Sequence, residues 1–130
     1  MTQIDPIADA LTNIQNSENA SKKIVTIMPG SKLLGQILRV MNEKGYVGSI
    51  EEVSDRHKKM YKVQLVGKIN KVAAIKPRYA VKRDDFERYE KRFLPARDIG
   101  MMIVSTSQGV MTHGESKEKA IVGRLLAYIY

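Results

Sequence analysis

Residues 101–112 read Met-Met-Ile-Val-Ser-Thr-Ser-Gln-Gly-Val-Met-Thr, and the rest of the chain is best understood outward from them. The apolar run Met101–Val104 passes directly into three hydroxyl side chains, which predicts a strand over residues 101–106 that ends at a polar surface. Hydroxyls donate and accept hydrogen bonds without carrying charge. Gly109 allows a positive φ or a close approach of the backbone to a ligand. The stretch therefore predicts a surface that binds a polar partner with many hydrogen-bonding groups.

Upstream of this stretch, residues 1–67 have the pattern of a small layer of helices on a sheet. Apolar residues recur at helical spacing after Asp5-Pro6, which suits a helix start, and again after Ser31, which suits a helix cap. The second helix is expected to stop before Gly45. β-branched and apolar runs predict strands over residues 23–28, 46–53 and 60–66. The last two strands are expected to be joined by a polar loop over residues 54–59.

The segment Gly67–Asn70 is the best candidate boundary between two lobes. Beyond it, Pro77 interrupts two short apolar pieces and predicts an edge strand or a bend. The sequence further predicts a charged helix over residues 84–92, a capping box at Thr112–Glu115 before a helix over residues 117–122, and, after Gly123, a final strand over residues 125–130.

These elements together predict an α+β fold of two small lobes. The N-terminal lobe, residues 1–67, is an α-β-α-β-β layer. The C-terminal lobe, residues 68–130, is mainly β with a short helix, and we expect it to carry the binding surface.

Charge is unevenly distributed along the chain. Lys and Arg number 22 against 14 acidic residues, which gives a net charge of +8. Residues 1–55 hold 5 basic and 7 acidic residues (net −2), residues 56–97 hold 14 and 4 (net +10), and residues 98–130 hold 3 and 3 (net 0). The strong positive charge of residues 56–97 indicates a polyanionic partner. Binding to a membrane surface is a weaker interpretation, because it typically uses a long amphipathic helix and this segment contains only short strand-like runs.

Composition also narrows the classes of protein to be considered. The chain has no cysteine, which excludes disulfides and thiolate metal sites and fits an intracellular protein. It has no apolar run of about 18 residues, so we expect no transmembrane helix. The N-terminus lacks the basic and apolar segments of a secretory signal.

The catalytic alternatives are weaker than the binding interpretation. Ser107 as a nucleophile with His113 or His57 as base would need an orienting carboxylate and an oxyanion hole, and no Gly-x-Ser-x-Gly turn is present. A metal-dependent nuclease acting on RNA would need a carboxylate cluster or a histidine pair brought together in space. A DNA-binding module would need a recognition helix rich in Arg, Asn or Gln. The sequence predicts no metal and no cofactor.

Three segments resemble one known family along the whole chain. Ser105-Thr106-Ser107-Gln108-Gly109-Val110-Met111-Thr112, followed by Glu115 and the ending Leu126–Tyr130, is similar to the signature of the eighth small-subunit ribosomal protein. Asp5–Ile14 resembles that family's opening helix. Ile75-Lys76-Pro77-Arg78-Tyr79 and Leu94-Pro95 resemble its central segment. The charged segment between Tyr79 and Leu94 looks like the archaeal branch.

The resemblance implies a non-enzymatic RNA-binding protein of the small ribosomal subunit, located in the cytoplasm. It implies binding to the central domain of small-subunit ribosomal RNA early in assembly, beside neighbouring ribosomal proteins, and some members also bind their own messenger RNA. Carried over by motif, the RNA-binding residues would be Ser105, Thr106, Ser107, Gln108, Gly109 and Thr112, supported by Lys76, Arg78 and Tyr79, with Asn13 and Asn16 as weaker candidates. Many members carry arginines where this chain has Asn13 and Gln15, so the resemblance does not imply a strong phosphate contact from the first helix here.

Overall fold

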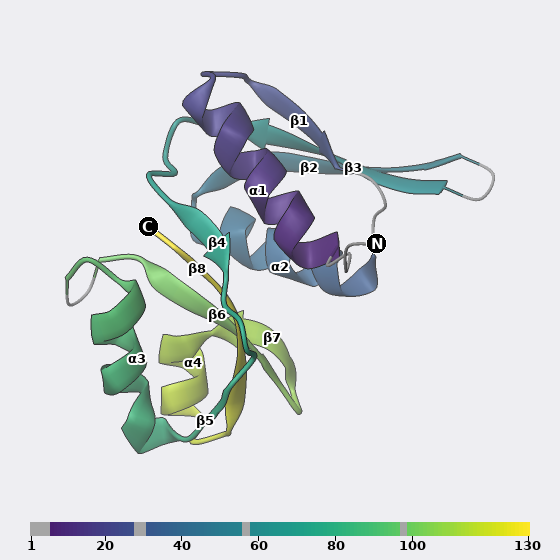
Figure 1. Ribbon diagram of the computed structural model, residues 1–130. Coiled ribbons are helices and arrows are strands. Elements are labelled where there is room, and N and C mark those ends of the chain that lie inside the picture. The colour runs from purple at the N-terminus through teal and green to yellow at the C-terminus, as the bar shows by residue number, and fades with distance from the viewer. Residues whose placement is uncertain (1–5, 28–30, 56–57, 97–98) are drawn as a thin grey trace, which may run out of the picture. The chain divides into compact units, whose positions relative to one another are not determined.

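The computed structural model of the chain describes residues 6–27, 31–55, 58–96 and 99–130 (Figure 1). The chain divides into two compact units, Met1–Ile69 and Asn70–Tyr130. Each unit combines helices with an antiparallel sheet, so the predicted α+β class is confirmed. Asp5 and His57, which entered the sequence predictions, lie outside the described residues.

Unit 1 is a three-stranded sheet with two helices on one face (Figure 1). Its elements are α1 (Pro6–Asn19), β1 (Ile24–Ile27), α2 (Lys32–Glu43), β2 (Val47–Asp55) and β3 (Lys58–Leu65). The strand order is β1-β3-β2. Buried and exposed residues alternate along β1, and the buried Val25 is paired with the buried Val63 of β3. This face of the sheet is covered by the helices, as the predicted layer of helices requires.

The two helices of unit 1 begin and bury their faces as their sequences predict. Ile7, Leu11 and Ile14 of α1 are buried, because they recur at helical spacing. The Ser31 side chain caps α2 by accepting a hydrogen bond from Leu34 N at 3.1 Å. Past the end of α2, Gly45 has φ +82°, a conformation that suits glycine at a helix C-terminus.

The predicted polar loop over residues 54–59 is wrong. Strand pairing continues through Ser54 opposite Lys59 and Asp55 opposite Lys58, so only residues 56–57 lie between β2 and β3. Backbone pairing satisfies the peptide groups whatever the polarity of the side chains, so a polar sequence can continue a strand. Lys59 Nζ lies 3.2 Å from Glu52 Oε1.

Unit 2 is a five-stranded sheet whose inner face is covered by two helices (Figure 1). The strand order is β4-β8-β6-β7, and β5 also pairs with β8. The elements are β4 (Val72–Ala74), β5 (Ala80–Val81), η1 (Arg83–Asp85), α3 (Phe86–Phe93), β6 (Met101–Thr106), β7 (Gly109–Thr112), α4 (His113–Glu118) and β8 (Gly123–Ile129). β4 and β5 flank Pro77 and pair with different parts of β8, which confirms the bend predicted there.

The core of unit 2 gathers side chains from every layer of the unit. Phe86 is fully buried at the start of α3 and packs with Met102 and Val104 of β6 and Leu125 of β8. Because Val104 faces this core, the next residue along β6 must face the other side of the sheet. This alternation decides the direction of each side chain at the polar end of β6.

The helix predicted over residues 117–122 is misplaced. The Thr112 hydroxyl does cap a helix, since it accepts a hydrogen bond from Glu115 N at 3.2 Å, but α4 begins at once and ends at Glu118. The chain then turns at Ala120, which has φ +53°. Gly123 belongs to β8 rather than to a helix end, and a Cβ there would lie 3.0 Å from the Val104 side chain. That glycine is required by packing between strands.

Membrane insertion through a helix finds no support in this fold. None of the helices among the described residues is long and apolar enough to span a bilayer.

Candidate RNA-binding surface

A tight hairpin presents the hydroxyl run. β6 pairs with β7 from Ile103 opposite Thr112 to Thr106 opposite Gly109, so Ser107 and Gln108 form the turn. The sequence predicted a strand end and a turn but not β7 as a strand. Gly109 has φ +110°, and among the residues that the structure describes, apart from its two chain neighbours, no atom lies within 4 Å of the position that a Cβ would take. The glycine therefore sets the turn and leaves open space beside it.

The Thr106 hydroxyl holds this turn together. It donates a hydrogen bond to Gly109 O at 2.8 Å and accepts one from Gln108 N at 3.1 Å. It also lies 4.0 Å from the sulfur of Met111, a member of the unit 2 core. Thr106 thus points to the helix-covered face of the sheet and has a structural role.

Ser105 points the other way, because its neighbour Val104 faces the core. On this outer face a single row of paired residues crosses four strands: Ala80 of β5, Arg124 of β8, Ser105 of β6 and Val110 of β7. Within the described residues, neither the Ser105 nor the Ser107 hydroxyl makes a hydrogen bond. Both remain available to a ligand.

Arg124 is the residue that the sequence predictions missed. It is exposed between the buried Gly123 and Leu125, and it stands directly opposite Ser105 on the neighbouring strand, at a Cα spacing of about 5 Å. Its Nη1 donates to the carbonyl oxygen of Arg78 at 3.0 Å. A guanidinium has five donors, so this bond orients the group without saturating it. The signal that could have found it is its isolation, because Arg124 is the one charged residue in the apolar segment of residues 121–130.

The Lys76–Arg78 loop is brought to the same surface through that bond. Leu125 N also donates to Tyr79 O at 2.8 Å, which ties the end of the loop to β8. Lys76 is exposed and Arg78 is half-buried. The loop that carries these two basic residues is therefore tied to β8 at Arg124, the residue paired with Ser105.

Tyr79 is not brought to this face. Its ring lies 5.6 Å from that of Tyr89 on α3, measured between centroids, and it packs against the unit 2 core. The next residue, Ala80, is exposed and belongs to the row on the outer face, where it is paired with Arg124. The Tyr79 side chain therefore lies on the helix-covered side of the sheet, opposite Ser105.

Thr112 also differs from the expectation of a direct side-chain contact. Only 6% of the residue is exposed, and its hydroxyl both caps α4 and lies 3.3 Å from Glu115 Oε1. Gln108, in contrast, is exposed at the tip of the turn. Thr112 helps to build the site, while Gln108 can reach out of it.

Asn13 and Asn16 belong to unit 1, on the exposed side of α1. Asn13 Nδ2 donates to Thr26 O at 3.3 Å, and its Oδ1 lies 3.5 Å from the Ser17 hydroxyl. Asn13 thus links α1 to β1. The hydroxyl run, in contrast, belongs to unit 2.

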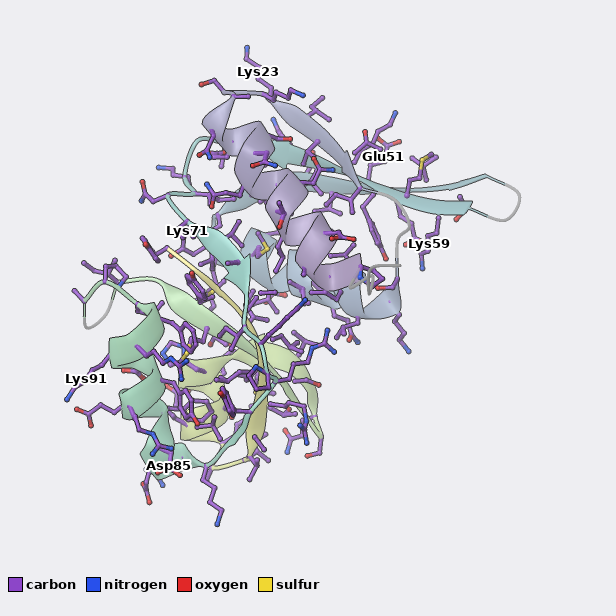
Figure 2. The ribbon with its side chains drawn as sticks, in the orientation of Figure 1. Lys23, Glu51, Lys59, Lys71, Asp85 and Lys91 are labelled. Atoms are coloured by element: carbon purple, nitrogen blue, oxygen red, sulfur yellow. The ribbon has the colours of Figure 1, made fainter. Side chains whose placement is uncertain are left out.

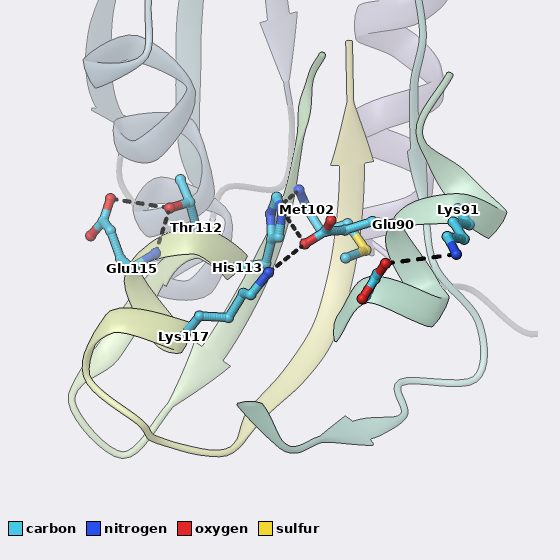
Figure 3. Close-up of polar contacts among 8 residues, drawn as sticks. Glu90, Lys91, Met102, Thr112, His113, Glu115 and Lys117 are labelled. Atoms are coloured by element: carbon cyan, nitrogen blue, oxygen red, sulfur yellow. Dashed lines mark hydrogen bonds and ion pairs between the residues drawn. The ribbon is translucent and has the colours of Figure 1, made fainter. Parts of the chain in front are cut away.

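His113 has a different setting from that of a catalytic base. Its Nδ1 accepts a hydrogen bond from Met102 N at 3.0 Å, and its Nε2 lies 3.2 Å from Glu90 Oε1 (Figure 3). The same carboxylate oxygen lies 3.0 Å from Lys117 Nζ. Both ring nitrogens thus have partners other than Ser107. Burial lowers the pKa of His113, although Glu90 opposes this shift, so the neutral imidazole is favoured.

The geometry gives no support to the alternative function of a metal-dependent nuclease. Across residues 6–27, 31–55, 58–96 and 99–130, no three His, Asp or Glu side chains gather in a way that could hold a metal ion.

The surface at the end of β6 thus combines unpaired hydroxyls, an amide and anchored cations, a set of groups suited to RNA phosphates, 2′-hydroxyls and base edges. Comparison with known protein families agrees with this chemistry. The family model described as ribosomal protein S8 matches residues 5–130. The chain belongs to the ribosomal protein S8 family, which consists of structural, ribosomal-RNA-binding proteins of the small subunit.

Proposed function

We propose that unit 2 holds a helical element in the central domain of small-subunit ribosomal RNA early in assembly, through the turn of the β6–β7 hairpin. The observation that carries this proposal is the juxtaposition of Ser105 and Arg124 on adjacent strands of one exposed face. Hydroxyl groups read RNA at short range, and the guanidinium supplies attraction to phosphate. Ser105, Ser107, Gln108 and Gly109 are the primary contacts in this proposal.

The basic residues around the hairpin set the strength of binding. Lys76 and Arg78 lie within residues 56–97, the most positive part of the chain, and the carbonyl oxygen of Arg78 accepts a hydrogen bond from Arg124. Phosphate contacts fix the register of a protein on its RNA, and neutral contacts select the sequence or shape. Thr106 and Thr112 support the surface through the hydrogen bonds of their hydroxyls. Tyr79 does so by packing, and Asn13 and Asn16 remain weaker candidates on unit 1.

Several finer assignments rest on the family resemblance and belong to the same proposal. The charged segment between Tyr79 and Leu94, which forms η1 and α3, supports placement in the archaeal branch. We further infer a protein without enzymatic activity, which works in the cytoplasm. Binding to its own messenger RNA would use the same hairpin, if that messenger carries a similar RNA helix.

The salt dependence of binding tests the proposal. The affinity for a central-domain RNA fragment should fall linearly with salt on a logarithmic scale, with a slope equivalent to about three to six neutralised phosphates. Replacing Lys76 and Arg78 together by alanine should reduce that slope and weaken binding to all RNAs similarly. A preference for duplex DNA over the RNA fragment, or binding indifferent to salt, would refute the proposal. RNA cleavage that requires magnesium would instead favour the nuclease.

A further inference from the structure

Unit 1 has a pocket of about 450 Å³ where the sheet emerges from beneath α2. The residues that shape its chemistry are Lys32, Gly35, Arg39, Glu52, Lys59 and Tyr61. They come from one face of α2 and from the paired strands β2 and β3. We call this feature the α2 pocket.

The α2 pocket exists because Gly35 of α2 lies against the Tyr61 side chain of β3. Tyr61 is 4% exposed, and its hydroxyl donates to Ser31 O at 2.9 Å, which fixes the ring beneath the first turn of α2. A Cβ on Gly35 would lie 2.5 Å from the Tyr61 hydroxyl oxygen. Helix interiors ordinarily disfavour glycine by about 1 kcal/mol relative to alanine. Here the missing side chain both admits the ring and leaves the space above it open.

The charges around the pocket are positive and only partly balanced. Glu52 pairs with Lys59 and raises the pKa of that lysine, so Lys59 is charged. Lys59 and Glu51 project to opposite sides of the hairpin, which leaves Glu52 as the carboxylate on the pocket side (Figure 2). Lys32 and Arg39 are exposed, and no ion pair forms for either among the described residues.

The two unbalanced cations lie on one side of α2. They are seven residues apart, which is two helical turns or about 10 Å along the axis. Between them the wall is neutral, with the amide of Gln36 and the backbone of Gly35. This arrangement suits one anionic group seated between two donors, because a guanidinium binds a carboxylate with two parallel hydrogen bonds.

We propose that the α2 pocket binds an acidic side chain, Asp or Glu, of a neighbouring protein in the small ribosomal subunit. The proposal rests on the family of the chain and not on the RNA-binding surface of unit 2. Two observations favour a carboxylate over RNA. Glu52 is half exposed in the wall and can accept a peptide N–H beside the bound carboxylate, a donor that a phosphate backbone lacks. Unit 1 holds 10 basic and 7 acidic residues, a net charge of +3, against 12 and 7, a net charge of +5, in unit 2, so it exerts the weaker long-range attraction on a polyanion.

Photocrosslinking in purified small subunits tests this proposal. A benzoylphenylalanine at Gln36 should form an adduct with a ribosomal protein, at a peptide that contains Asp or Glu. The same probe at Lys62, which is exposed on the opposite face of the sheet, is the matched control and should not give that adduct. Adding Arg39→Glu should lower the yield from Gln36 at least fivefold, and Arg39→Lys should largely restore it.

A milder variant and a second measurement keep the test decisive. If Arg39→Glu fails to enter subunits, Arg39→Gln replaces it, with an expected loss of about twofold or more. Affinity for the central-domain RNA fragment should stay unchanged in all these variants, so failure here is distinguishable from failure of the hairpin proposal. An adduct between Gln36 and ribosomal RNA, no adduct with any other molecule, or a yield indifferent to Arg39 would overturn the proposal.

Discussion

The turn at Ser105–Gly109 and the cluster Glu90–His113–Lys117 are both polar regions of unit 2, but their atoms are used differently. In the cluster, Glu90 Oε1 pairs with both His113 Nε2 and Lys117 Nζ. The other ring nitrogen, His113 Nδ1, accepts a hydrogen bond from Met102 N. The side chains of His113 and Glu90 are only 14% and 19% exposed. In the turn, Thr106 alone is engaged, while Ser105 and Ser107 remain open to a ligand.

The difference separates stability from binding. Polar groups that pair with one another in a half-buried setting hold α3 to α4 and β6, since leaving one of them without a partner would cost free energy. Polar groups that stay unpaired at a surface add nothing to folding and are available for recognition. The two regions therefore predict opposite responses to mutation.

The largest effect should come from Glu90→Ala. It removes the partner of both His113 and Lys117 and should lower the free energy of unfolding by about 2–3 kcal/mol. Urea unfolding measures the loss. Glu87→Ala is the control, because its ion pair with Lys91 is exposed and should contribute at most about 0.5 kcal/mol. RNA affinity that falls in the folded Glu90→Ala protein would break the separation of the two regions.

The second largest effect should come from Gly109→Ala, which should lower the free energy of unfolding by about 1–2 kcal/mol. Its φ of +110° is strained for a residue with a Cβ, although nothing in the described part of the chain beyond its two sequence neighbours lies within 4 Å of that Cβ position. Gly109→Val should reduce RNA affinity further than Gly109→Ala, since its branches would fill space left for RNA. Melting temperature and RNA affinity are measured on the same samples. A stability loss with unchanged affinity in both variants would limit Gly109 to the turn.

Thr106→Val should cost about 1 kcal/mol of stability. The valine keeps the shape of threonine but loses the bonds to Gly109 O and Gln108 N. Affinity for specific and random RNA should change in parallel, because the hydroxyl points to the core side of the sheet. A selective loss of specific binding would show that Thr106 contacts RNA directly.

The smallest effect should be a dependence of stability on pH. The pKa of His113 is lowered below its ordinary value of 6.5 by burial, so the unfolded chain takes up this proton first as the pH falls. Stability should therefore decrease as the pH falls through about 6.5 towards the lower pKa of the folded state. Glu90 and Lys117 face the ring and are included in this shift. In His113→Asn the decrease between pH 7.5 and 5.5 should be smaller; an equal decrease would assign it to other groups.

Elements with strong periodicity were predictable from the sequence. The helical face of α1 and the Ser31 cap of α2 follow from local patterns, and both appear as predicted. The capping box at Thr112 was also correct, but the end of its helix was not, because Ala120 adopts a positive φ without a glycine to announce it. β7 was missed because its residues form a strand only by pairing with β6.

The candidate surface was predictable only in part, since register decides which side chains meet. The hydroxyl run was visible in the sequence, but the opposite directions of Ser105 and Thr106 depend on which of them follows the core-facing Val104. Arg124 lies nearly twenty residues away and reaches Ser105 only through the pairing of β8 with β6. Tyr79 could not be distinguished from a base-stacking residue until its contact with Tyr89 was known.

The most direct test of the account is the RNA specificity of the double variant Ser105→Ala/Ser107→Ala. Its affinity is measured for the central-domain fragment and for random RNA of equal length, at one salt concentration. The ratio of the two affinities should fall by an amount equivalent to about 1–3 kcal/mol, while the melting temperature stays unchanged, since neither hydroxyl has a partner within the described part of the chain. An unchanged ratio would contradict the claim that the open hydroxyls of the β6–β7 turn recognise the RNA.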